Sequence, residues 1–100
     1  MKIVQIISRR DSESKLKTMM NAKERELRRK GTTLIRQKAG RWRHAKYPGW
    51  INWDESHGRV IVATIQSRLP ESEWQLLSSF IGYIDRHFGE EVESITISYR

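Results

Sequence analysis

Two short stretches of this chain, KIVQII at its start and GRVIVATIQS just past its middle, carry apolar residues on both faces of an extended backbone. β-Branched residues dominate both stretches, and they occupy successive positions rather than alternate ones. A third stretch, ESITISY, is apolar on one face only, because isoleucine alternates there with threonine and serine. Strands that are apolar on both faces fit the middle of a sheet, so the pattern predicts two central strands and a final edge strand.

The segments between these strands have the spacing of helices. Residues 11–31 contain three acid-to-base pairs four positions apart, with Asp11 or Ser12 as the N-cap and Gly31 at the C-terminal end. A second helix is predicted to begin at Pro70. Its apolar residues recur at steps of three and four, at Trp74, Leu77, Ile81, Ile84 and Phe88. This spacing predicts a helix with one buried face.

Residues 32–53 are predicted to be extended, in one or two pieces, and residues 54–58 (DESHG) to form a hairpin loop. The element order is then β-α-β-β-α-β. We therefore expect a single α+β domain over residues 1–100, with a ferredoxin-like arrangement in which two helices cover one face of an antiparallel sheet. The uncovered face would present Val60 and Val62, which are the predicted interface for a protein partner or for a second copy in a symmetric homodimer.

Positive charge is concentrated in the first half of the chain. Residues 1–50 hold fifteen Lys or Arg and four acidic residues, whereas residues 51–100 hold four Arg and eight acidic residues, and the net charge is +7. This asymmetry indicates a polyanionic partner. An incidental dipole, or contact between the basic half of one copy and the acidic half of another, would be equally consistent with the composition.

The polyanion that we expect is a nucleic acid, DNA or RNA, held through its phosphates without strong sequence readout. The predicted contact residues cluster at the end of the first helix and along the second extended region: Arg25, Arg28, Arg29, Lys30, Arg36, Lys38, Arg41, Arg43 and Lys46. The aromatic residues Trp42, Tyr47, Trp50 and Trp53 could add stacking surfaces for bases. The favoured interpretation is that Trp42 packs on a helix and that Trp50 and Trp53 cap the core. The RNA-recognition motif shares the expected topology, but its aromatic residues on the first and third strands have no counterpart in KIVQII or GRVIVATIQS.

Known catalytic and metal-binding patterns are missing from the sequence. Cysteine is absent, the three histidines lie far apart, and the neighbours Asp54, Ser56 and His57 are typical of a turn rather than of a catalytic triad. No glycine-rich phosphate loop occurs. We therefore expect no catalytic residue, no metal and no cofactor. The predicted function is a small non-enzymatic nucleic-acid-binding module, and the alternative is a protein-interaction or regulatory subunit that docks through its open sheet face.

Long apolar runs are also missing. No stretch approaches the ~18 apolar residues of a membrane span, and the run near the N-terminus is shorter than the core of a signal peptide. The sequence therefore predicts a cytoplasmic protein without a membrane partner.

Overall fold

The computed structural model describes residues 1–9, 16–28, 34–38, 41–57 and 60–99. In chain order its elements are β1 (Lys2–Ser8), α1 (Leu16–Arg28), β2 (Leu34–Lys38), β3 (Arg41–His44), β4 (Trp50–His57), β5 (Val60–Gln66), α2 (Pro70–Phe88), the 3-10 turn η2 (Gly89–Glu91) and β6 (Val92–Tyr99). The predicted caps of the first helix, Asp11 or Ser12 and Gly31, lie outside the described residues. None of the described helices is both long enough and apolar enough to span a membrane.

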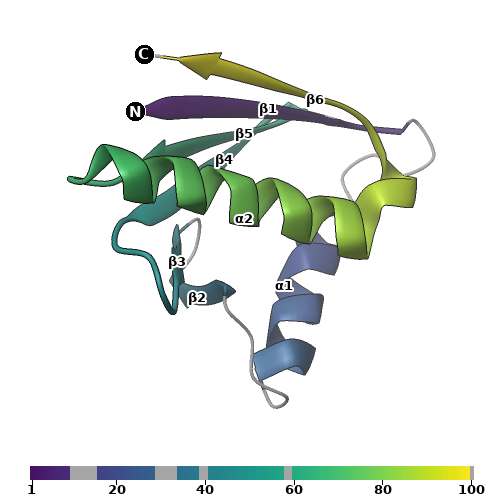
Figure 1. Cartoon of the computed structure of the whole chain (residues 1–100). Helices are drawn as coiled ribbons and strands as arrows, with labels where there is room; N and C mark the ends of the chain where they lie inside the picture. The colour runs from purple at the N-terminus through teal and green to yellow at the C-terminus, as the bar shows by residue number, and fades with distance from the viewer. Residues whose placement is uncertain (10–15, 29–33, 39–40, 58–59, 100) are drawn as a thin grey trace.

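The strands form one six-stranded sheet in the order β2-β3-β4-β5-β1-β6, and every neighbouring pair is antiparallel (Figure 1). This confirms the predicted α+β class, with one antiparallel sheet and two helices in the described residues. Strands β1 and β5 have a neighbour on each side and β6 lies at an edge, as their apolar patterns predict. The radius of gyration is 12.7 Å, close to the ~13 Å typical of a compact domain of this length.

The sheet differs from the predicted four-stranded, ferredoxin-like arrangement because β2 and β3 extend it beyond β4. The region predicted to form one or two extended pieces turns back on itself twice and gives three strands. Residues 54–57, predicted as part of a hairpin loop, belong to β4, where Asp54 pairs with Val62 and Glu55 with Ile61. Backbone pairing with β5 thus continues through this polar segment of β4.

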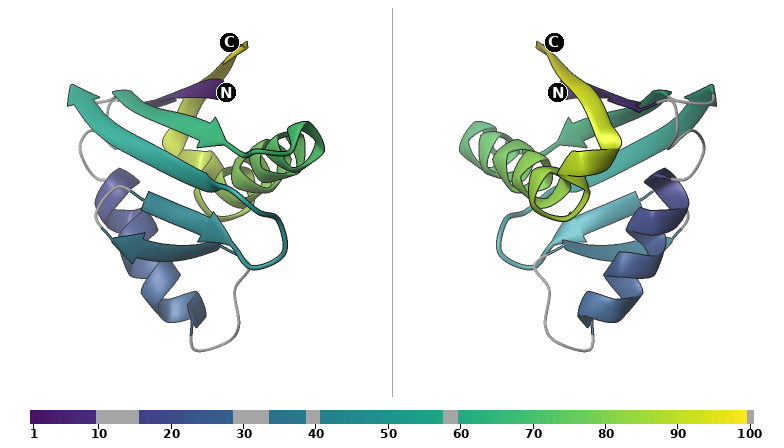
Figure 2. Two further views of the ribbon diagram at one scale, coloured as in Figure 1. Left: turned by 90° about the vertical axis from the view of Figure 1, so that its left-hand side faces the viewer. Right: turned by 90° about the vertical axis from the view of Figure 1, so that its right-hand side faces the viewer.

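The core lies on one face of this sheet. Every second residue of β5 is buried, starting at Ile61, and the buried residues of β1 and β3 follow the same alternation. Side chains from both helices complete the same cluster, with Met20 from α1 and Phe80 from α2 almost fully buried. Figure 2 shows that the sheet curls around α2, with β2 and β3 on one side of the helix and the other strands on the opposite side.

This curl changes which residues of α2 are buried. Trp74, predicted as part of the buried face, is 54% exposed, and Ile81 is only partly buried. Leu76, Phe80 and Tyr83 are buried instead. The buried face of α2 is therefore displaced around the helix towards Leu76, Phe80 and Tyr83, which leaves Trp74 outside it.

Candidate functional site

Strand β3 alternates strictly between the two faces of the sheet. Trp42 and His44 are buried on the helix side, and Trp42 packs edge-on against Tyr83 of α2, with ring centroids 6.2 Å apart. The packing of Trp42 on a helix is therefore confirmed. Because side chains alternate along a strand, Arg41 and Arg43 lie on the opposite, outer face. The structure thus brings two of the predicted contact residues together.

Arg41 is held in place by two neighbours on β4. Its Nε donates a hydrogen bond to Oδ1 of Asn52, 3.1 Å away, and Asn52 is its cross-strand partner. Its guanidinium carbon lies 5.1 Å from the centroid of the Trp50 ring. A cation–π contact of this kind contributes about 0.5–1 kcal/mol at an exposed site. The guanidinium is therefore fixed over an indole ring, with donors left over for a ligand.

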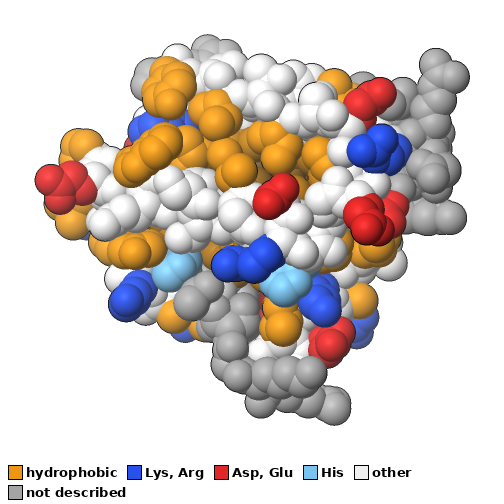
Figure 3. Space-filling model, turned by 45° about the vertical axis from the view of Figure 1, so that its right-hand side comes forward, with side chains coloured by type: hydrophobic (Ala, Val, Ile, Leu, Met, Phe, Trp, Pro, Cys, Tyr) orange, Lys and Arg blue, Asp and Glu red, His pale blue; other side chains and the backbone are white. Residues whose placement is uncertain are grey.

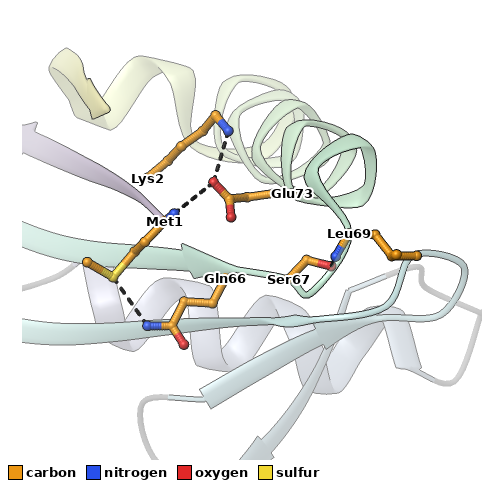
Figure 4. A network of polar contacts seen from close by, with 6 residues as sticks. All are labelled: Met1, Lys2, Gln66, Ser67, Leu69 and Glu73. Atoms are coloured by element: carbon orange, nitrogen blue, oxygen red, sulfur yellow. Dashed lines mark hydrogen bonds and ion pairs between the residues drawn. The ribbon is translucent and has the colours of Figure 1, made fainter. Parts of the chain in front are cut away.

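Trp50, predicted to cap the core, is 38% exposed at the start of β4. Its indole Nε1 donates to Oε1 of Gln66, its partner on β5, at 3.3 Å. The amide nitrogen of Gln66 in turn donates to the sulfur of Met1 at 3.2 Å (Figure 4). These contacts hold the ring at the surface, so that part of the indole is open to solvent.

A groove of about 450 Å³ lies beside Trp50. Its lining is mainly apolar and consists of Pro48, Gly49, Trp50, Gln66, Ser67, Arg68 and Leu69. One wall depends on Gly49, which has a φ of 120° and approaches β5 so closely that a Cβ would lie 2.3 Å from the carbonyl oxygen of Gln66. Ser67 lies next to Gly49 in this lining, and its Oγ accepts a hydrogen bond from the backbone N–H of Leu69 at 3.2 Å.

Several cations at the site are available to a ligand. Arg43, Lys46 and Arg68 are exposed, and none of them forms an ion pair with a carboxylate in the described part of the chain. Lys2 is different, because its Nζ donates to Oε1 of Glu73 at 2.9 Å (Figure 4). The same carboxylate oxygen lies 3.1 Å from the N-terminal ammonium. Lys2 is thus already partnered.

Glu73 is a nearly buried acid at the first turn of α2. Burial acts to raise the pKa of its carboxyl group, but the hydrogen bonds and charges of Lys2 and the N-terminal ammonium outweigh that effect, so the pKa is lowered. The carboxylate therefore stays ionised and ties β1 to α2.

Among the predicted contact residues whose side chains are described, Arg25 lies away from Arg41 and Arg43. Arg25 is exposed on α1, which packs on the helix side of the sheet. The remaining basic residues of the first helix end and β2 lie outside the part of the chain whose side chains are described, namely Arg28, Arg29, Lys30, Arg36 and Lys38. Val60 and Val62 lie on the outer face, where they are partly buried.

The histidines that the structure describes have structural roles. Nδ1 of His44 accepts hydrogen bonds from the backbone N–H groups of Lys46, at 2.9 Å, and Tyr47, at 3.4 Å. Burial and, to a smaller extent, the charge of Lys46 lower the pKa of His44, which keeps the acceptor nitrogen unprotonated. No group of three or more His, Asp or Glu among the described residues is arranged to hold a metal ion. The side chains of Asp54, Ser56 and His57 lie outside the described part.

The predicted contact residues do not include Gln66 or Arg68, and Trp50 was assigned to the core in preference to base stacking. The signal that was present is the Pro48-Gly49 pair directly before Trp50, since a turn that needs a positive φ also positions the residue that follows it. Comparison with known proteins gives no further guide, because no protein-family model, curated protein or solved structure matches the chain significantly. The function of the chain is therefore inferred from the geometry of the site.

Proposed function

We propose that this chain is a small module that binds single-stranded nucleic acid on the outer face of β3 and β4. The observation that carries the proposal is the position of Arg41 over the exposed ring of Trp50, next to the groove and to the exposed Arg43. Proteins that bind single strands combine cations that follow the phosphate backbone with aromatic rings on which bases stack. Both components occur together here, on a face of the sheet that the described helices leave uncovered.

The groove favours single-stranded over duplex nucleic acid. A base that is free of its partner can enter between Pro48 and Leu69 and lie against Trp50, whereas a paired base keeps its faces stacked within the duplex. The amide of Gln66 offers a hydrogen-bonding group at the same wall. Phosphates on either side of such a base would meet Arg41 and Arg43 on the strand side and Arg68 on the groove side. The net charge of +7 adds long-range attraction for the polyanion.

The test compares two exposed tryptophans. Replacing Trp50 by alanine is expected to weaken the binding of a labelled single-stranded oligonucleotide by about 1–3 kcal/mol, or roughly 5- to 150-fold, through loss of one stacking surface. Trp74→Ala is the matched control, since Trp74 is more exposed but lies on α2. Fluorescence anisotropy at low salt measures both affinities. Equal losses in the two variants, or unchanged affinity in Trp50→Ala, would contradict the proposed surface.

Docking of a protein partner at Val60 and Val62 is the alternative use of the outer face. Both valines are only partly buried, but the largest exposed apolar side chains of the described residues lie elsewhere, at Leu69, Trp74 and Tyr99. This distribution favours the nucleic-acid proposal for the outer face. A cytoplasmic location is part of the same proposal, because a chain without cysteine suits a reducing compartment.

A further inference from the structure

Strand β6 is an edge strand whose pairing with β1 is regular from Ser94 to Tyr99, with one register shift near its start, at Glu93. It is eight residues long and, within the described residues, pairs only with β1. Alternate backbone N–H and C=O groups along such an edge point away from the sheet. Natural edges are commonly blocked by Lys, Arg or Pro, and the edge strand β2 is short and contains Arg36 and Lys38. Strand β6 has no such residue, and Glu93 is its one charged residue.

A band of apolar side chains runs alongside this edge. Figure 3 shows hydrophobic side chains gathered between helix α2 and strand β6. Trp74 is 54% exposed and Tyr99 69% exposed, and Ile81, Ile95 and Ile97 are only partly buried against the core. Single exposed apolar residues are ordinary, but a contiguous band beside an open strand edge marks an interaction surface.

The pattern of β6 is complementary to itself. If two copies pair in antiparallel fashion about Thr96, Ile95 of each copy faces Ile97 of the other, and serine faces serine on the outer face. Glu93 of each copy then meets the end of the other strand that carries Tyr99. The Nζ of Lys2 lies 5.5 Å from the centroid of the Tyr99 ring. Lys2 and the N-terminal ammonium share the single carboxylate of Glu73, so this end keeps a net positive charge that would face Glu93 of the other copy.

We propose that two copies of this chain associate through antiparallel pairing of their β6 strands, which gives one continuous sheet. A two-fold axis through Thr96 places both α2 helices on the same side of that sheet. The indole of Trp74 and the ring of Tyr99 from each copy then lie in the channel between the two helices, where the apolar band is removed from water. The outer faces of β3 and β4 lie at the far ends of the joined sheet, so the interface leaves them open.

Cysteine cross-linking tests the register directly, because the chain contains no cysteine of its own. Opposed residues in an antiparallel pair have Cα atoms about 4.5–5.5 Å apart, which is within disulfide range. Under mild oxidation, Thr96→Cys is expected to convert to a covalent dimer. Thr18→Cys replaces an exposed threonine on α1, away from β6, and is the matched control, which is expected to form no covalent dimer. Equal cross-linking of the two variants would overturn the proposal.

Light scattering supplies the second measurement. The wild-type chain is expected at twice its mass of 11.9 kDa, and Thr96→Lys, which places two ammonium groups opposite each other on an exposed face, is expected at the monomer mass. Thr18→Lys should remain dimeric. A wild-type monomer at every concentration, an assembly larger than a dimer, or a dimer that is broken by Val62→Glu and not by Thr96→Lys would each overturn the pairing of β6. None of these outcomes depends on whether the chain binds nucleic acid.

Discussion

Tyr83 shows how a single buried polar atom affects stability. Its side chain is 3% exposed, and its hydroxyl has no hydrogen-bond partner among the described residues. Burial, and to a smaller extent the neighbouring Glu24, raise the pKa of the phenol to about 12. The ring itself is well packed, with its centroid 4.8 Å from that of His87. The ring therefore stabilises the core while the hydroxyl opposes burial.

Tyr83→Phe is therefore expected to raise the free energy of unfolding by about 1 kcal/mol, because it removes a desolvated hydroxyl and keeps the ring contacts. Urea denaturation measures the change, with Tyr47→Phe as a control at a partly buried position. A fall of similar size in Tyr83→Phe would mean that the hydroxyl has a partner that stabilises the fold.

The ion pairs of Glu73 with Lys2 and the N-terminal ammonium should make the stability of the fold depend on pH. Its pKa is lowered in the folded protein, so its contribution is fully present above the pKa of the unfolded state, near 4.5, and is lost as the pH falls through the folded value. Glu73→Gln should lower stability by about 1–2 kcal/mol at neutral pH, because the two charged donors keep an acceptor oxygen but lose its negative charge. The difference from wild type should shrink below about pH 4.

Chemical denaturation at a series of pH values tests this account of Glu73. Glu71→Gln is the matched control, since Glu71 lies in the same first turn of α2 but is exposed. If Glu73→Gln differed from wild type by the same free energy of unfolding at pH 3 and at pH 7, the ion pair of Glu73 would not explain the loss of stability at low pH.

At the scale of elements, the loop from His44 to Trp50 fixes the groove, and Gly49 is its critical residue. Gly49→Ala would place a Cβ in a left-handed backbone conformation and 2.7 Å from the Cδ1 of Leu76, as well as against β5. We expect the free energy of unfolding to fall by about 2–3 kcal/mol. Gly82→Ala on α2 is the control, because no atom lies within 4 Å of the added Cβ. It should stabilise the helix by about 0.5–1 kcal/mol.

Thermal denaturation of both glycine variants checks this contrast. If Gly49→Ala were as stable as wild type, the loop would have to move away from β5, and the wall of the groove would not be set by a close backbone approach. A destabilised Gly82→Ala would indicate a contact on the exposed side of α2.

Some of the strands and helices could be predicted from the sequence, and others could not. Strands β1, β5 and β6 and the position of α2 follow from local patterns of apolar residues, and all four were predicted. The division of the segment from Leu34 to His57 into three strands was not, because a polar, aromatic-rich segment carries no clear period. The exposures of Trp50 and Trp74 were both predicted wrongly. Trp50 alternates with the buried Ile51 and so lies on the outer face of β4, and Trp74 lies outside the face of α2 that the sheet buries.

At the scale of the molecule, the basic residues whose side chains are described do not all lie on one surface. Arg41 and Arg43 share the outer face of β3, whereas Arg25 lies on α1 on the helix side of the sheet. The sequence predicted the type of residue at the site but not its location, since the face on which a basic residue lies is decided by strand alternation and by helix packing. The proposed site is therefore smaller than the basic half of the chain.

The salt dependence of binding to a single-stranded oligonucleotide tests directly whether Arg41 and Arg43 contact the phosphates of a bound strand. For single strands, the slope of log affinity against log salt changes by about 0.7 for each phosphate contact. The double variant Arg41→Gln, Arg43→Gln should lose affinity at low salt and show a slope reduced by about 1.4, whereas Arg25→Gln should keep the wild-type slope. Absence of binding by the wild-type chain at low salt, or a slope that only Arg25→Gln reduces, would contradict the account.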